Sequence, residues 1–337
     1  MEHFSFIQEG LGFDPLLTLL FAAVGSFAAC LILPCVHWFR NFSVGAPTDN
    51  PCHPAGRKSR AGGLAVVVAA ILVSVLATGT ISPWRPIIIY LIGLFIVGLL
   101  DDMHPLTPGW KIVLQVPLAF FVVLSIPRAT WVHTGVPWVF LQVGWIVVMT
   151  NAFNIVDVAD GLLTGLALPA LAALGALLAM AGFYDVGSIS LAFTGALLGF
   201  LPFNAFPGRI MLGDSGSLPL GGLVAILVLL IPSQAAPGPT ILWAFLLTGV
   251  VLFEVVQISW RRVRLGIPPW QGSPHHLIFW LVNRGLPLPW AVVLLSLVQA
   301  ILLVPFGLAT RSWLWVAPVG AALLTLTLIP TLRRDAG

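Results

Sequence analysis

The sequence predicts an all-α, polytopic integral membrane protein with about ten or eleven transmembrane helices in one domain, residues 1–337. Of its 337 residues, 59% are hydrophobic and only 8% are charged, and the mean hydropathy is +1.03. That composition lies far outside the range of soluble domains. Apolar runs of about 20 residues recur along the chain, and a helix of that length crosses a bilayer.

The apolar runs set the expected helices one by one. We place them at roughly 14–38, 62–80, 86–100, 109–126, 136–153, 162–182, 188–206, 217–232, 239–260, 288–308 and 311–332. No soluble domain, long linker or low-complexity tract interrupts this series. The absence of a clear internal repeat weakens a reading as a secondary transporter.

The distribution of basic residues predicts the topology. Eleven crossings place the two termini on opposite sides of the membrane. If the loop 39–61 faces the cytoplasm, 12 of the 15 Lys and Arg residues lie inside or at the inner edge. Positive residues prefer the cytoplasmic side, so the N-terminus is expected outside and the C-terminus in the cytoplasm. This topology also accounts for the pI of about 9.1, and no nucleic-acid partner is expected.

The strongest polar signal is a series at every third position, Asn151, Asn154, Asp157 and Asp160. Two carboxylates and two amides beside apolar sequence are costly unless something binds them. On an α-helix these residues share about half the circumference, and on a 3₁₀ turn they align. Either arrangement predicts one polar wall. Helix capping explains one such residue, but not four.

A second signal is the pair Asp101-Asp102, followed by Lys111 and Gln115. Adjacent carboxylates repel each other and need a cation or a proton nearby. Oxygen ligands of this kind suit Mg²⁺, and a lysine can hold a phosphate. A solvated helix end is the alternative interpretation.

A third signal is Asn204 followed by Gly213-Asp214-Ser215-Gly216-Ser217 at the start of an apolar helix. Backbone N–H groups at a helix start can receive phosphate oxygens, and Asp214 could hold a metal. The alternative is that Ser215 or Ser217 caps the helix, and both roles are compatible.

A fourth signal joins an arginine cluster, Arg261, Arg262 and Arg264, to the pair His275-His276 in a loop flanked by Pro and Gly. The arginines partly set topology and also suit anionic lipid headgroups. The histidines suit phosphate or metal.

These acidic and basic groups converge on one predicted membrane face. The loop 49–63, which carries Arg60, adds further positive charge, although alone it is ordinary cytoplasmic sequence. Carboxylates for Mg²⁺ and basic groups for phosphate describe phosphoryl transfer, where catalysis is mainly positioning and charge neutralisation. A site at the membrane edge indicates that one substrate is a lipid.

In order and spacing, these motifs resemble those of the polyprenyl-phosphate N-acetylhexosamine-1-phosphate transferases (glycosyltransferase family 4). The likeness extends from about Asp49 to Arg284. Arg60-Ala61-Gly62-Gly63 is similar to the family's Pro-Arg-x-Gly-Gly, and Asn151 to Gly161 to its Asn-x-x-Asn-x-x-Asp-Gly-x-Asp-Gly. The matching segments also include Asp101-Asp102 with Lys111 and Gln115, Asn204 with Gly213 to Ser217, and the histidine loop.

Three departures accompany the resemblance. Val158 replaces the first glycine of Asp-Gly-x-Asp-Gly, and the loop before Gly62 is short and lacks a clean His-x-x-Pro-x-Pro pattern. The histidine loop reads Ser-Pro-His-His where the family has His-x-His-His. That loop is expected to face the sugar nucleotide, so the identity of the sugar is left open. All five acids of the motifs are present, so catalysis is expected to be retained.

The resemblance implies a Mg²⁺-dependent enzyme, or Mn²⁺ in its place, in the bacterial cell (inner) membrane. A polyprenyl phosphate, undecaprenyl or another, attacks the β-phosphorus of a UDP-N-acetyl sugar, giving polyprenyl-diphospho-sugar and UMP. Such a reaction begins peptidoglycan, lipopolysaccharide or another surface polysaccharide. A homodimer is left open.

The resemblance also implies roles for individual residues. Asp214 is the main metal ligand, Asp102 assists it, and Asp101 deprotonates or positions the lipid phosphate. Lys111 and Arg60 bind substrate. For Asp101, the open alternative is that it acts as a nucleophile and forms a covalent phospho-aspartyl intermediate. The remaining expected contacts to nucleotide, sugar or diphosphate are Asn151, Asn154, Asp157, Asp160, Asn204, His275 and His276.

Two functions of other classes remain as alternatives. An ion-coupled transporter would place acids near the middle of the bilayer, whereas nearly all acids here lie at helix ends. Glu254 is the main exception, about two turns before Arg261. A catalytically inactive scaffold of a cell-envelope complex is expected to lose some of the acids, and none is lost.

Overall fold

The computed structural model describes residues 14–33, 43–45, 57–78, 82–126, 135–232, 236, 239–310, 319, 323 and 325. Within these ranges, eight helices are long and apolar enough to cross a membrane, and two more apolar helices are shorter. The prediction of an all-α, polytopic membrane protein is therefore confirmed. The predicted last helix, 311–332, lies outside the described residues except for three single positions.

The helices begin and end within a few residues of the predicted boundaries. In chain order the elements are α1 (Pro15–Ile32), β1 (Ser43–Gly45), β2 (Arg57–Ser59), α3 (Gly62–Thr78), α4 (Arg85–Met103), α5 (Pro108–Ser125), α6 (Val136–Val156), α7 (Leu162–Met180), α8 (Tyr184–Asn204), α9 (Asp214–Leu229), α10 (Thr240–Arg264), α11 (Leu277–Asn283), α12 (Leu288–Leu302) and α13 (Val304–Thr310). The predicted helix 288–308 is observed as α12 and α13. Two elements were not predicted: the short antiparallel hairpin of β1 and β2, and α11.

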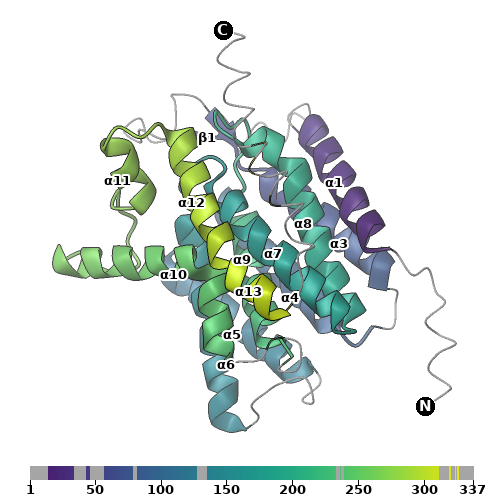
Figure 1. The fold of residues 1–337 in the computed structure, drawn as a ribbon. Coiled ribbons are helices and arrows are strands. Elements are labelled where there is room, and N and C mark those ends of the chain that lie inside the picture. Colours follow the sequence, from purple (N-terminus) through teal and green to yellow (C-terminus); the bar gives the residue numbers. More distant parts are fainter. Residues whose placement is uncertain are drawn as a thin grey trace, which may run out of the picture.

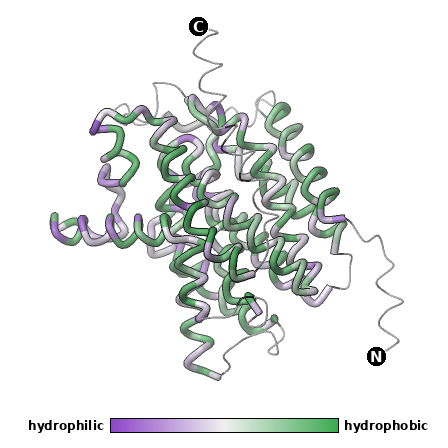
Figure 2. Tube along the Cα trace, viewed as in Figure 1, coloured by the Kyte–Doolittle hydropathy of each residue, from purple (hydrophilic) through white to green (hydrophobic). Residues whose placement is uncertain are grey.

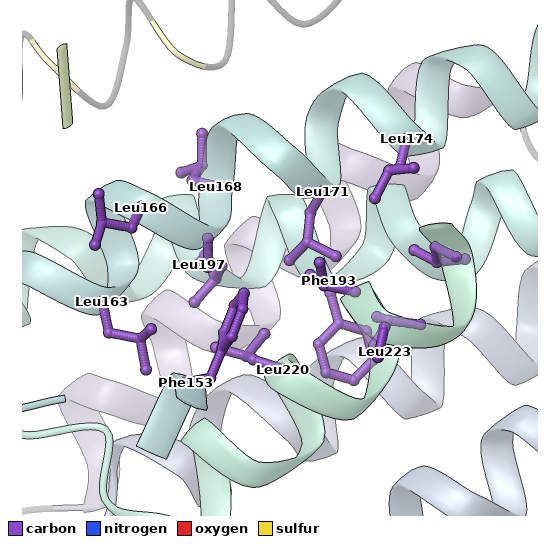
Figure 3. Close-up of a cluster of buried hydrophobic side chains, with 14 of the residues drawn as sticks. Phe153, Leu163, Leu166, Leu168, Leu171, Leu174, Phe193, Leu197, Leu220 and Leu223 are labelled. Carbon is purple, nitrogen blue, oxygen red and sulfur yellow. The ribbon is translucent and has the colours of Figure 1, made fainter. Parts of the chain in front are cut away.

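The centre of the bundle is α7, of which 94% of the most apolar 18-residue window is buried (Figure 1). Aromatic and leucine side chains from α6, α7, α8 and α9 meet around it, among them Phe153, Leu171, Phe193 and Leu220 (Figure 3). In contrast, α1 and α5 are only 22% buried and expose leucine, valine and tryptophan side chains. Such apolar outer faces are those expected of helices in contact with lipid.

Helix α10 is bent in its middle. Thr248 has φ −135° and ψ 20°, outside the helical range. After this bend the helix leaves the bundle and runs sideways as an arm, and α11 lies above this arm in the view of Figure 1. The far end of this arm is hydrophilic and carries Arg261, Arg262 and Arg264 (Figure 2).

Candidate active site

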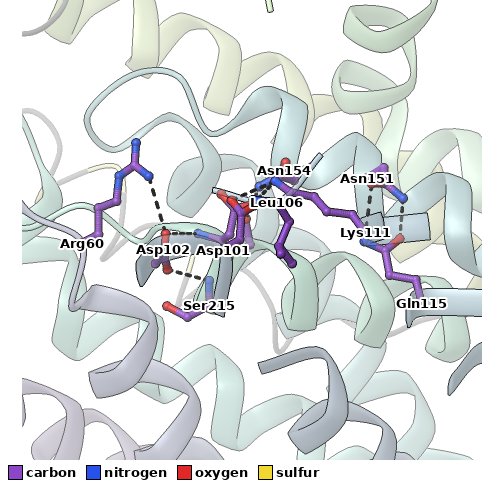
Figure 4. Close-up of polar contacts among 11 residues, drawn as sticks. Arg60, Asp101, Asp102, Leu106, Lys111, Gln115, Asn151, Asn154 and Ser215 are labelled. Carbon is purple, nitrogen blue, oxygen red and sulfur yellow. Dashed lines mark hydrogen bonds and ion pairs between the residues drawn. The ribbon is translucent and has the colours of Figure 1, made fainter. Parts of the chain in front are cut away.

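The site lies where four helix ends meet: the C-terminal ends of α4 and α6 and the N-terminal ends of α5 and α9 (Figure 4). Close packing of α4 on α9 makes this meeting possible. A Cβ atom on Gly98 of α4 would lie 2.2 Å from the carbonyl oxygen of Asp214. Only glycine permits that approach, so Gly98 brings the Asp101-Asp102 pair against the start of α9.

The start of α3 holds the loop before α9 in place. The N–H groups of Gly62 and Gly63 donate hydrogen bonds to the carbonyl oxygens of Met211 and Leu212, at 3.0 and 2.7 Å. Arg60 follows β2 directly, and its Nη1 lies 3.8 Å from Oδ1 of Asp102. The arginine predicted from the sequence therefore reaches Asp102, which together with Asp101 and Asp214 is called the carboxylate cluster below.

Asp102 caps helix α9 from another helix. Its Oδ1 accepts the N–H of Asp214 at 3.1 Å, and its Oδ2 accepts the N–H of Ser215 at 2.9 Å. The prediction that Ser215 or Ser217 caps this helix is wrong, because α9 already begins at Asp214 and both serines lie inside it. Two of the backbone N–H groups expected to receive phosphate are thus bound to Asp102.

Lys111 lies between two carboxylates. Its Nζ is 2.9 Å from Oδ2 of Asp101 and 2.6 Å from Oδ2 of Asp214. Asp101 is further held by the N–H of Leu106, which donates to its Oδ1 at 2.8 Å. The three side chains come from α4, α5 and α9, so one ammonium joins three helices and offsets the repulsion between the two acids.

The amides of α6 tie this helix to its neighbours. Asn151 Nδ2 donates to Gln115 Oε1 of α5 at 2.6 Å. Asn154 Nδ2 donates to Ser217 Oγ of α9 at 3.0 Å. Both residues therefore lie beside the cluster, as Figure 4 shows.

The predicted polar wall is divided after these two amides, because α6 ends at Val156. Asp157 is half-buried, and burial raises its pKa from 3.8 to about 8, helped by the charges of Asp214 and Asp102. Asp160 instead turns toward the loop after α8, where it is 2% exposed and accepts the N–H of Gly208 at 2.9 Å. The four residues do not form one face.

Asn204 joins two loops behind the cluster. Its Oδ1 accepts the N–H of Gly161 at 3.2 Å and the hydroxyl of Thr164 at 2.8 Å. Its Nδ2 donates to the carbonyl oxygen of Ile210 at 3.1 Å. These contacts are structural, and the predicted contact with sugar or diphosphate stays a prediction.

The histidine loop is held by α10. Nδ1 of the buried His276 lies 2.9 Å from Oε1 of Glu254, and the N–H of Leu277 donates to the same carboxylate. Among the residues that the structure describes, no hydrogen bond or ion pair joins His275 or His276 to the carboxylate cluster. The sequence-predicted site is thus observed as two parts.

The donor set fits a magnesium ion that is shared with substrate. Within the described part of the chain, no group of three or more His, Cys, Asp or Glu residues is arranged to hold a metal alone. Mg²⁺ usually takes only one or two protein carboxylates and completes its shell with water and substrate phosphates. Asp101 and Asp214 already converge on one cation, the ammonium of Lys111, and that arrangement meets this requirement.

Three polar residues had no partner predicted from the sequence: Gln115, Ser217 and Glu254. Gln115 and Ser217 belong to the motifs, but their pairing with Asn151 and Asn154 depends on how the helices pack. Glu254 had a signal of its own, since an acid inside an apolar helix requires a partner. That partner is His276.

Comparisons with known proteins identify relatives over most of this chain. The model of a family described as "Glycosyl transferase family 4" matches residues 84–231. The chain is 30% identical over 332 residues to a phospho-N-acetylmuramoyl-pentapeptide-transferase of Shouchella clausii, covering 88% of this chain and 98% of that protein. It is also 30% identical over 271 residues to a probable undecaprenyl-phosphate N-acetylglucosaminyl 1-phosphate transferase of Bacillus subtilis, covering 77% of this chain and 75% of that protein. The matched segment 84–231 contains the acids of the cluster, but neither Arg60 nor the histidine loop.

Proposed function

Because this chain belongs to glycosyl transferase family 4, we propose that its carboxylate cluster transfers a sugar 1-phosphate from a UDP-N-acetyl sugar to a polyprenyl phosphate. The chain is a phospho-sugar transferase of cell-wall synthesis, embedded in the membrane by apolar helices. The relatives' names include both an N-acetylmuramoyl-pentapeptide and an N-acetylglucosamine transferase at 30% identity. The two names therefore do not decide between these sugars.

The observation that carries the proposal is the junction of Asp101, Lys111 and Asp214 at the ends of three apolar helices. A phosphate of the lipid attacks the β-phosphorus of the nucleotide sugar. A new P–O bond forms to the lipid phosphate, and the bond between the β-phosphorus and the bridging oxygen breaks, releasing UMP. The negative charge of two phosphorylated substrates requires positive groups on the protein, and Lys111 and Arg60 supply them.

The ligands for Mg²⁺ predicted from the sequence are Asp214 and Asp102, and the contacts of Lys111 support Asp101 as a further candidate. Asp101 and Asp214 share one cation, whereas both oxygens of Asp102 already accept backbone N–H groups. We therefore assign Asp214 and Asp101 as the main metal ligands and Asp102 as the residue that holds Asp214 in place. When bound, Mg²⁺ supplies charge neutralisation at the diphosphate.

The residues around the metal ligands then have distinct tasks. Asp101 also positions or deprotonates the lipid phosphate, and a covalent phospho-aspartyl intermediate at Asp101 is the alternative mechanism. Asn151 and Asn154 orient the nucleotide side through the α5 and α9 partners that hold them. The histidine loop contacts the sugar or its diphosphate. Asp157, next to the cluster, tunes the affinity for the cation.

The test is release of UMP by the purified protein in detergent with undecaprenyl phosphate, Mg²⁺ and a panel of UDP-N-acetyl sugars. Release that requires both the lipid and the metal is the expected result, and the panel names the donor. Replacement of Mg²⁺ by Mn²⁺ tests the choice of metal. Absence of UMP with every donor, from protein shown to be folded, contradicts the proposal and favours a scaffold or a transporter.

We also propose that the site faces the cytoplasm, where UDP-sugars are made. The support is the excess of Lys and Arg in the loops on that side of the predicted topology. In a cysteine-free background, Gln271→Cys places a thiol in an exposed part of the histidine loop. A membrane-impermeant maleimide should label it in inverted vesicles but not in intact spheroplasts. Labelling only in spheroplasts would indicate the opposite orientation, with the site outside the cytoplasm.

A further inference from the structure

Part of the bend in α10 is explained within the helix, where the Thr248 hydroxyl donates to the carbonyl oxygen of Ala244 at 2.7 Å, but the other backbone groups at the bend need partners from elsewhere. The helix runs from Thr240 to Arg264 without a proline, yet Thr248 departs from helical geometry. Such a bend breaks the ladder of backbone hydrogen bonds, so N–H and C=O groups lose their partners. Inside a membrane no bulk water replaces those partners, and another polar group must supply them.

One side chain, Gln299 of α12, supplies them. Its Nε2 donates to the carbonyl oxygens of Leu246 and Leu247, each at 3.0 Å, and its Oε1 accepts the N–H of Val250 at 3.2 Å. These three backbone groups flank Thr248 on both sides. Gln299 is 0% exposed, and its amide combines the donors and the acceptor that the bend requires.

The bend matters because the arm beyond it carries the whole histidine loop. Glu254 binds His276 and the N–H of Leu277, and Gln257 Nε2 donates to the carbonyl oxygen of His275 at 3.5 Å. Arg262, near the end of the arm, holds the same loop at two further points. Its Nε donates to Ser273 Oγ at 2.9 Å and its Nη1 to the carbonyl oxygen of Pro269 at 2.6 Å.

From these contacts we infer that Gln299 is a positioning residue: it fixes the bend of α10 and thereby the place of the histidine loop relative to the carboxylate cluster. It touches neither substrate nor reacting atoms. The arm and the loop are tied together along their length, and they join the bundle at the bend of α10 and through the connection from α11 to α12 (Figure 1). The importance of the loop for catalysis rests on the proposed function, but the control of the bend does not.

The direct test measures where the arm points. In a background without Cys30, Cys35 and Cys52, spin labels are placed at Val263 on the arm and at Leu72 on α3, which are 58% and 59% exposed. Double electron–electron resonance then gives the distribution of distances between them. Gln299→Met keeps the side-chain length but removes all three hydrogen bonds. We expect a broader or displaced distribution.

Ser296→Ala is the matched control. Ser296 lies one turn earlier on α12, is equally buried, and its hydroxyl has no hydrogen-bond partner among the described residues. Its distance distribution should equal that of the wild type. If Gln299→Met does not fold, Gln299→Asn keeps the amide but shortens its reach by one carbon, and a change in the same direction is expected. A wild-type distribution in the folded Gln299 variant overturns the inference.

A kinetic readout separates this inference from the proposed function. We expect Gln299→Met to lower kcat/KM for the UDP-sugar by at least about tenfold, mainly through KM, with Ser296→Ala within about twofold of the wild type. If the proposed function is wrong, the wild type also releases no UMP, while the distance change persists. If the positioning role is wrong, the wild type is active and the Gln299 variant keeps the wild-type distances.

Discussion

The ammonium of Lys111 lies 2.6 Å from Oδ2 of Asp214, and the same ammonium lies 2.9 Å from Asp101. Two acids from different helices thus share one cation at the centre of the candidate site. Carboxylates so placed repel each other unless positive charge lies between them. The two acids therefore already hold one cation, the ammonium of Lys111, and its removal tests whether Mg²⁺ can take its place.

We expect Lys111→Met to lower the melting temperature in the absence of divalent ions and to make Mg²⁺ more stabilising than it is for the wild type. The two acids lose their shared partner, and a bound metal replaces it. Thermal unfolding in detergent, with and without Mg²⁺, measures both effects. Arg85→Met, at the exposed start of α4 and thus at the end of that helix opposite to Asp101, is the control. Equal stabilisation of all three proteins by Mg²⁺ would show that Lys111 does not compete with the metal, and no stabilisation of any of them would contradict a metal site here.

Asp214→Asn should reduce UMP release by at least about 100-fold, because it removes a charge that the metal and Lys111 both require. The variant should still insert and fold. Asp185→Asn is a suitable control, since Asp185 lies at the opposite end of the bundle, where it accepts a hydrogen bond from Ser82. Activity near that of the wild type in Asp214→Asn would remove Asp214 from the mechanism.

The helices and the positions of the polar motifs could be predicted from the sequence for a physical reason. Long apolar runs must form helices in a membrane, and polar residues must collect at their ends. Asp101, Lys111 and Asp214 were therefore placed near the same membrane face. The close approach of α4 and α9 at Gly98, in contrast, is an observation of the structure and was not predicted.

The pairings between helices could not be predicted in the same way. Asp102 and Ser215 are separated by 113 positions, and periodicity within one helix does not report which helix packs against it. For this reason Ser215 was expected to cap its own helix. The direction of the chain after Val156 was not predicted either, so Asp160 was assigned to a face that it does not share. The bend at Thr248 could not be predicted because α10 contains no proline, and Gln299, which binds the backbone at the bend, lies on another helix.

Asp102 offers a test of the inter-helix cap. Asp102→Ala removes the acceptors of two backbone N–H groups at the start of α9, and loss of a cap costs about 1–2 kcal/mol in unfolding free energy. Asp102→Asn keeps one acceptor oxygen and should cost less. Unfolding of both variants in mixed detergent micelles measures the difference. Equal stability of the two variants would show that the cap contributes little.

Gly98→Ala should disrupt the site through packing alone. The new Cβ would lie 2.2 Å from the carbonyl oxygen of Asp214, so α4 and α9 must separate. We expect a lower melting temperature and a loss of UMP release. Gly109→Ala, in the first turn of α5, is the matched control, because a Cβ there meets no atom within 4 Å. A Gly98→Ala protein as active as Gly109→Ala would mean that the helices accommodate the methyl group.

Asp157 should give the protein a pH-dependent stability when no divalent metal is bound. Its pKa is raised from 3.8 to about 8, so the folded protein binds a proton at neutral pH that the unfolded chain has lost. The stabilising contribution is complete below about pH 4, declines as the pH rises, and is gone above about pH 8. Melting temperatures of metal-free protein between about pH 6 and pH 9 should therefore fall more steeply for the wild type than for Asp157→Asn, which cannot ionise.

Asp185→Asn, the control, should keep the wild-type slope. Because a metal beside Asp157 favours the ionised carboxylate, Mg²⁺ should flatten the dependence of the wild-type melting temperature on pH. An identical slope for metal-free wild type and Asp157→Asn would show that this carboxyl does not titrate between about pH 6 and pH 9.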